Sequence, residues 1–273
     1  MHTHLLTIVA GEYPASSRVP GADGPSLRTM RRGVELVGCG TRRLRLDADT
    51  YLVTNGATTE ASAHDGDASV SPLLIAFRRD TPAVPPFAFV ETLLPRSGAV
   101  GHHLQQIEHA LQAGPVDPMW WDERIVLLHG AVIDAEQLLQ ARAGTIESLK
   151  PATRRELLRR VLLASDFIQS NYERPITLDQ IAAAARLSRF HLVRQFRRVH
   201  GLPPHDYLTA RRVAAALRLL SQTQLGLDDV AAHCGLGTRS SLFRQLRSRQ
   251  GRSASALRGG EPRNMEPACS TFA

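Results

Sequence analysis

The stretch Leu178-Asp-Gln-Ile-Ala-Ala183 recurs about 50 residues later as Leu227-Asp-Asp-Val-Ala-Ala232. Repeats of this length identify a structural unit that occurs twice, and therefore constrain the fold. After one extra residue in the second copy, the same register extends into a basic segment, where it aligns Leu192 with Leu242, Arg194-Gln195 with Arg244-Gln245 and Gly201 with Gly251. We therefore expect two copies of one supersecondary motif.

Each copy has the pattern of a short helix, a tight turn and a longer basic helix, which is the helix-turn-helix plan. In the first copy Pro175 interrupts the preceding helix, and Thr177 with Gln180 forms a capping-box pattern. Ser188 can cap the second helix, and Gly201 can end it.

The second helix of each copy has an apolar face and a basic face. Leu192, Phe196 and Val199 share one stripe in the first copy, as do Leu242 and Leu246 in the second. The side chains expected to face outward are Phe190, His191, Arg194, Arg197 and Arg198 in the first copy, and Ser240, Ser241, Arg244 and Arg247 in the second. A basic outer face on such a helix suits the DNA major groove.

These residues resemble the AraC/XylS transcriptional regulators, whose DNA-binding region holds two helix-turn-helix motifs joined by a long helix. The resemblance covers roughly residues 153–258. It rests on Leu187-Ser188, Leu192, Arg194, Phe196, Gly201, Pro204 and Tyr207 in the first motif, and on Ala231, Gly235-Leu236, Leu242, Arg244, Gly251 and Arg258 in the second.

The resemblance places the base-contacting positions of the family on one side of each recognition helix. They are Phe190, Val193 and Arg194 in the first motif, and Arg239, Ser240 and Arg244 in the second. With these included, the candidate DNA-binding residues are Ser188, Phe190, His191, Val193, Arg194, Arg197, Arg198, Arg239, Ser240, Ser241, Arg244 and Arg247. Four positions depart from the family pattern, and three of them lie in the second motif: Arg186, Phe243, Ala254 and Leu257.

Charge divides the 273 residues into two expected domains. Residues 1–150 carry 13 basic and 17 acidic side chains, a net charge of −4, whereas residues 151–273 carry 20 and 9, a net charge of +11. The basic half contains the repeat, so we assign polyanion binding to it. We expect a sensor or dimerisation domain over 1–150, a DNA-binding domain over 151–258 and a disordered tail over 259–273.

The first domain has β signals over 34–77 and helical signals over 98–142. Short runs separated by turn residues predict strands at Val34–Val37, Arg43–Leu46, Tyr51–Thr54 and Leu73–Phe77, with a turn at Asp47–Asp49. Apolar stripes predict helices at Val100–Gln112 and Pro118–Arg142, which can pack on the strands or on a second subunit.

Short strands separated by tight turns imply a small barrel or a sandwich. The expected fold class is α+β: a small β-barrel with helices, followed by an all-α domain with two helix-turn-helix motifs. The family resemblance implies that the barrel is a reduced cupin-like sensor. Trp120-Trp121 either lines a ligand pocket or an interface, or pairs one buried ring with one surface ring.

The residues of the first domain offer no set of metal ligands or catalytic groups. His64 is the only histidine between Val34 and Phe77, and Cys39, Cys234 and Cys269 are far apart without a CxxC motif. His102-His103 and His109 could bracket a metal, but adjacent histidines at a helix start are more often solvated. We therefore expect no metal, no cofactor, no catalytic residues and reduced cysteines.

Residues Leu5–Ala10 are too short for the core of a signal peptide, and no apolar run reaches the ~20 residues of a membrane span. We expect a cytoplasmic protein that does not bind membranes.

Long helices at Thr153–Tyr172 and His205–Ser221 should begin the DNA-binding domain and join its two motifs. The expected function is sequence-specific regulation of transcription, with double-stranded DNA bound at two adjacent major-groove segments. A small-molecule effector, a homodimer and RNA polymerase are the other expected partners. The alternatives are a cupin-type metal-dependent enzyme fused to a DNA-binding domain and an effector-free regulator that acts through protein contacts. The sequence does not specify the operator, the effector or the sign of regulation.

Overall fold

The computed structural model describes residues 6–14, 18–19, 24–40, 42–56, 59–63, 69–77, 89–114, 116–144, 146 and 150–250. The chain forms two compact units, Met1–Leu139 and Gln140–Ala273. The tail predicted for 259–273 lies outside the described residues, as do His64, Ala254, Leu257 and Cys269.

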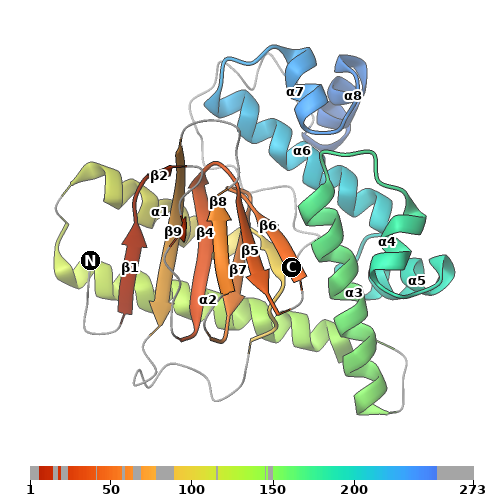
Figure 1. The fold of residues 1–273 in the computed structure, drawn as a ribbon, viewed down its shortest axis with the longest axis horizontal. Coiled ribbons are helices and arrows are strands. Elements are labelled where there is room, and N and C mark those ends of the chain that lie inside the picture. The colour runs from red at the N-terminus through yellow and green to blue at the C-terminus, as the bar shows by residue number, and fades with distance from the viewer. Residues whose placement is uncertain are drawn as a thin grey trace. The chain divides into compact units, whose positions relative to one another are not determined.

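The strands of the first unit form two antiparallel sheets (Figure 1). The larger sheet has the order β1-β9-β4-β7-β10, with β2 paired to β9, and the smaller has the order β3-β8-β5-β6. The strand bounds are β1 Leu6–Ala10, β2 Tyr13–Pro14, β3 Arg18–Val19, β4 Ser26–Arg32, β5 Glu35–Cys39, β6 Arg42–Leu46, β7 Thr50–Thr54, β8 Thr59–Ala63, β9 Ser69–Phe77 and β10 Leu93–Pro95.

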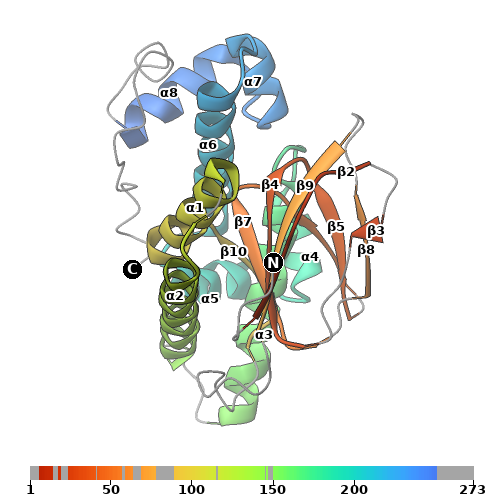
Figure 2. The ribbon, with the colours of Figure 1, turned by 90° about the vertical axis from the view of Figure 1, so that its left-hand side faces the viewer.

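The first unit has three layers, because the larger sheet is buried on both faces (Figure 2). On β7, Tyr51 and Val53 join a core with α1 (Gly98–Ala113) and α2 (Pro118–Gly144), whereas Leu52 between them joins a second core with the smaller sheet. Alternation along a strand sends neighbouring side chains to opposite faces, so one strand supplies both cores.

The predicted strands and helices of this unit occur in the structure, but the predicted small barrel does not, and the two packed sheets correspond to the sandwich alternative. Each sheet ends in edge strands, so the described strands form two open layers. The chain passes between the two sheets several times, and two of these crossings are sharp corners that the structure describes throughout. Gly33, with a φ of +80°, turns the chain from β4 into β5.

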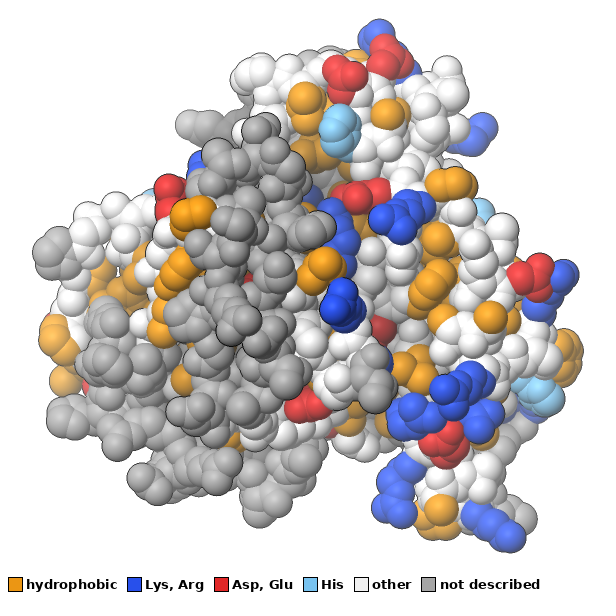
Figure 3. Space-filling model, viewed as in Figure 1, with side chains coloured by type: hydrophobic (Ala, Val, Ile, Leu, Met, Phe, Trp, Pro, Cys, Tyr) orange, Lys and Arg blue, Asp and Glu red, His pale blue; other side chains and the backbone are white. Residues whose placement is uncertain are grey.

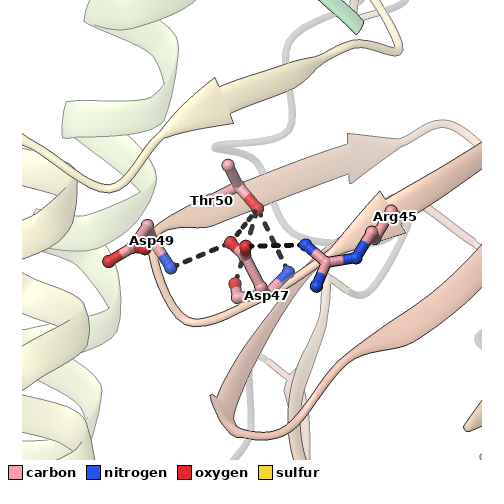
Figure 4. Close-up of polar contacts among 4 residues, drawn as sticks. All are labelled: Arg45, Asp47, Asp49 and Thr50. Carbon is pink, nitrogen blue, oxygen red and sulfur yellow. Dashed lines mark hydrogen bonds and ion pairs between the residues drawn. The ribbon is translucent and has the colours of Figure 1, made fainter. Parts of the chain in front are cut away.

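The second corner is the predicted turn at Asp47–Asp49, which joins β6 of the smaller sheet to β7 of the larger one. The Asp47 carboxylate accepts hydrogen bonds from the Asp49 backbone N–H and from Thr50 Oγ1, each at 3.1 Å (Figure 4). Arg45 Nη1 lies 3.4 Å from its other oxygen. One buried carboxylate therefore holds the turn closed and fixes the point where the chain changes sheet.

A buried ion pair joins the two sheets. Arg28 of β4 and Glu35 of β5 expose 1% and 0% of their side chains, and Arg28 Nε lies 3.4 Å from Glu35 Oε2. We did not predict β4, because its sequence SLRTMRR contains three arginines and such residues are seldom buried. The strand is nevertheless central in the larger sheet, between β9 and β7.

The tryptophan pair contributes to the core between helix and sheet. Trp121 is buried, and Trp120 is partly buried against the same cluster. Their rings are perpendicular to each other, with the centroids 5.1 Å apart. The sequence left open whether the apolar stripe on α2 packs on the strands or on a second subunit. In the structure this stripe packs on the larger sheet of its own chain.

The second unit is helical. Its helices are α3 Pro151–Asn171, α4 Leu178–Ala184, α5 Arg189–His200, α6 Pro204–Gln222, α7 Leu227–His233 and α8 Arg239–Gln250. These bounds agree with the two predicted long helices and with the two predicted motifs, α4–α5 and α7–α8. None of the described helices combines the length and the apolar character that crossing a membrane requires.

Candidate nucleic-acid interface

The first motif begins and ends at the predicted caps. Thr177 and Gln180 form a reciprocal capping box at the start of α4. Ser188 Oγ accepts the backbone N–H of His191 at the start of α5, and Gly201 ends α5 with a left-handed φ of +76°. These caps satisfy backbone groups that a short helix leaves open, so they fix where each helix begins and ends.

The predicted apolar stripes are buried. Leu192, Phe196 and Val199 on α5 are 0% exposed, as are Leu242 and Leu246 on α8. The opposite face carries the candidate DNA-binding residues. Those that are exposed are Ser188, Phe190, His191, Arg194, Arg197, Arg239, Ser240, Arg244 and Arg247, and those that are half-buried are Val193, Arg198 and Ser241. On the face shown in Figure 3, basic side chains gather mainly over the helical half.

An ion pair that we did not predict ties the two helices of the first motif together. The Arg189 guanidinium donates two hydrogen bonds to the Asp179 carboxylate, one from Nε and one from Nη2. Asp179 begins α4 and Arg189 begins α5, so the pair braces the motif on its exposed side. Arg189 is thereby engaged within the protein.

The second motif differs at the equivalent positions. Arg239 aligns with Arg189, but its guanidinium lies over the Phe243 ring, 5.3 Å from the centroid. Thr238 Oγ1 accepts the backbone N–H of Ser241, which caps α8. Phe243, a departure from the family pattern, therefore supports an arginine at the start of the recognition helix.

The linking helix α6 and the turn of the second motif both contact the C-terminal end of α3. From α6, Arg212 donates to the backbone oxygens of Tyr172 and Arg174, each at 2.8 Å. The neighbouring Arg211 guanidinium lies 3.9 Å from the centroid of the Tyr172 ring. Gly235, in the turn of the second motif, packs against the same backbone. These contacts hold α6, and with it the separation of the motifs, against a fixed point on α3.

His200 is a further residue that we did not single out from the sequence. It is buried with its ring centroid 4.4 Å from that of Phe196 and 4.9 Å from that of Tyr207. Burial, and to a lesser extent the charge of Arg142, lowers the pKa of His200 to about 3. The imidazole is therefore neutral near pH 7, and its role is to pack α5 against α6.

The turn of the first motif contains one residue with a positive φ, Arg186, and the repeat aligns it with Gly235, one of the two glycines with a positive φ in the second turn. Arg186 has a φ of +52° in the first motif, and Gly235 has a φ of +67° in the second. Arg186 stands where the family commonly has glycine, and the backbone keeps the left-handed conformation all the same. This conformation costs a residue with a side chain about 1 to 2 kcal/mol.

We expect Gly235→Ala to destabilise the chain by about 2 kcal/mol or more. The added Cβ would lie 2.6 Å from Tyr172 O and 2.7 Å from Glu173 O, in addition to the unfavourable φ. The matched control is Arg186→Gly, which relieves the same backbone conformation and should stabilise by roughly 0.5 to 1 kcal/mol. Urea unfolding of the full chain measures both. A Gly235→Ala variant as stable as the parent would show that this turn is not packed as described.

Neither a metal site nor a membrane segment emerges from the described part of the chain. No group of three or more His, Cys, Asp or Glu side chains in it is arranged to hold a metal ion. His102 and His103 lie side by side near the start of α1, and both described cysteines, Cys39 and Cys234, are buried as free thiols.

Comparisons with known proteins place the second unit among transcription regulators. A family model described as a helix-turn-helix domain matches residues 181–260. The chain is 35% identical over 72 residues to the lactose operon transcription activator of Staphylococcus xylosus, a match that covers 26% of each protein. It is 29% identical over 92 residues to the HTH-type transcriptional activator AarP of Providencia stuartii, covering 34% of this chain and 68% of AarP.

Among solved structures, the chain is similar to a probable AraC family transcriptional regulator from Rhodopseudomonas palustris. The identity is 25%, the TM-score is 0.34, and the match covers 37% of this chain and 94% of that one. The chain thus spans about a quarter of the length of the first curated relative and about two thirds of the second. Both of these curated relatives are activators of transcription by name.

Proposed function

Because this chain belongs to the AraC/XylS family of helix-turn-helix transcriptional regulators, we propose that it binds specific double-stranded DNA sites through both of its motifs and so regulates transcription. The observation that carries the proposal is the pair of recognition helices. Both α5 and α8 bury an apolar stripe and expose arginines, Arg194 and Arg197 on one and Arg244 and Arg247 on the other. An exposed arginine in the major groove can donate two hydrogen bonds to one guanine.

The two helices are proposed to enter successive segments of the major groove on one face of the duplex. Helix α6 has 19 residues and is therefore about 28 Å long. One turn of DNA is roughly 34 Å, or about 10.5 base pairs, so a rigid helix of this length can set two motifs about one turn apart. The contacts of Arg212 and Gly235 with the end of α3 support that rigidity.

We expect Arg194→Ala in the full chain to weaken specific binding by about 1 to 3 kcal/mol, because a base contact would be lost. The control is Arg155→Ala, which removes the same charge from an exposed position on α3. Affinity for the operator and for random DNA is measured at several salt concentrations. Parent binding should weaken steeply with salt, because 151–273 carries a net charge of +11.

In the same measurement, Arg155→Ala should affect operator and random DNA alike, whereas Arg194→Ala should mainly affect the operator. If Arg194→Ala bound both DNAs as tightly as the parent, its assignment as a base-contacting residue would be wrong. Binding that did not change with salt would contradict the proposed phosphate contacts.

The first unit is proposed to modulate this activity, either through a small-molecule effector or as the site of a homodimer. Helix α2 supports the second possibility. It packs on the sheet through one face and exposes large apolar side chains on another, namely Met119, Val126, Leu127 and Leu138. Contact with RNA polymerase remains part of the proposal, since the curated relatives include transcription activators.

A further inference from the structure

Phe190 is an apolar side chain in an unusual place. It exposes 71% of its surface at the first turn of α5, whereas Leu192, Phe196 and Val199 on the same helix are fully buried. An exposed phenylalanine ring gains nothing from folding, because its contact with water is kept in the folded state. Its position on the outward side of a recognition helix suggests that the ring is covered when the helix binds DNA.

The surroundings of Phe190 make this ring the apolar centre of a charged surface. Arg189, just before it, is held by Asp179. The ring of His191 lies edge-on with its centroid 6.0 Å away, and Arg194 follows one helical turn later. Basic side chains on this face draw the helix toward phosphates, so the ring would be carried to the floor of the groove rather than to another protein surface.

The major groove has one apolar group on its base edges, the 5-methyl group of thymine. We propose that Phe190 determines part of the operator sequence by packing against a thymine methyl in the half-site of the first motif. This inference rests on the proposed function, and it adds the chemical identity of one base that the first motif requires.

The second motif does not share this feature. The residue that aligns with Phe190 is Ser240, which presents a hydroxyl group instead of a ring. The aromatic residue of that helix, Phe243, lies about one turn further on, is half-buried and is covered by Arg239. The two half-sites should therefore differ, and the requirement for a methyl group at this helix position should belong to the first half-site alone.

The test replaces thymine by deoxyuridine, which removes the methyl group and leaves the hydrogen-bonding edge unchanged. The operator is first selected from random DNA with the full chain, and each thymine of both protected segments is then replaced singly. The segment whose footprint is weakened by Arg194→Ala is assigned to the first motif, and the segment whose footprint is weakened by Arg244→Ala is assigned to the second. Affinities are measured for the parent, Phe190→Ala, Arg194→Ala and Ser240→Ala.

We expect the parent to lose about three- to tenfold in affinity at one thymine of the first segment. Phe190→Ala should bind the thymine and uracil forms equally well. Arg194→Ala and Ser240→Ala should bind more weakly but keep the full response to methyl removal, because they leave the ring in place.

The proposal is overturned if no thymine of the first segment responds, or if Phe190→Ala responds as strongly as the parent. Either result would leave selective operator binding, and with it the proposed function, intact. Failure of the full chain to select any DNA sequence would instead overturn both.

Discussion

Arg28→Met alone, or Glu35→Leu alone, is expected to destabilise the first unit by about 3 to 5 kcal/mol. Each change leaves one charged or polar group without its partner between two sheets, where both side chains are at most 1% exposed. The double variant Arg28→Met/Glu35→Leu should be close to the parent in stability, because an apolar pair of similar volume avoids the cost of burying charge.

Urea unfolding of the full chain at pH 8, followed by a signal from the first unit such as Trp120 and Trp121, measures all three variants. Single variants within about 1 kcal/mol of the parent would mean that the pair contributes little. A double variant as unstable as the sum of the two singles would show that each side chain has a separate structural role.

The same pair predicts how stability depends on pH. Burial raises the pKa of the Glu35 carboxyl to about 7, although the charge of Arg28 opposes the shift. The folded state then holds this proton more tightly than the unfolded state, whose pKa is near 4.5. The contribution of Glu35 to stability is therefore present below pH 4.5 and is lost as the pH rises toward 7, and the double variant should lack this component.

Local patterns located the described helices of both units, but only four of the described strands, and β1, β2, β3, β8 and β10 were not predicted. Alternating apolar residues located β5, β6, β7 and β9, but β4 was missed because Arg28, Arg31 and Arg32 read as solvent-exposed. The buried arginine of β4, Arg28, pairs with Glu35. Glu35 is close to Arg28 in sequence, but it belongs to β5 of the other sheet. The strand pattern left a barrel and a sandwich of two sheets open and could not decide between them, since strand order depends on long-range pairing rather than on local sequence.

The candidate interface was more accessible to sequence reasoning, because caps and stripes are local. Thr177, Ser188 and Gly201 could be assigned from residue type and spacing alone, and the structure confirms all three. The contacts of Arg212 with the end of α3 could not, since 40 residues separate Arg212 from Tyr172. The positive φ of Arg186 was signalled by the family pattern, which commonly has glycine at this position, and by the alignment of Arg186 with Gly235 in the second copy.

The central claim is that both motifs, held at a fixed separation, bind one DNA site. The most direct measurement is the affinity of the full chain for its operator after five, and separately ten, base pairs are inserted between the two protected segments. Five base pairs turn one segment to the far side of the duplex, and ten restore the face but add about 34 Å.

We predict that both insertions lower affinity by about 100-fold, to the level of an Arg239→Ala/Arg244→Ala variant on the original operator, because loss of the second motif removes at least two arginine contacts. A rigid α6 cannot follow either displacement. Affinity within about threefold of the original after the five-base-pair insertion, or its recovery with ten, would contradict the claim that a fixed separation of the two motifs defines the site.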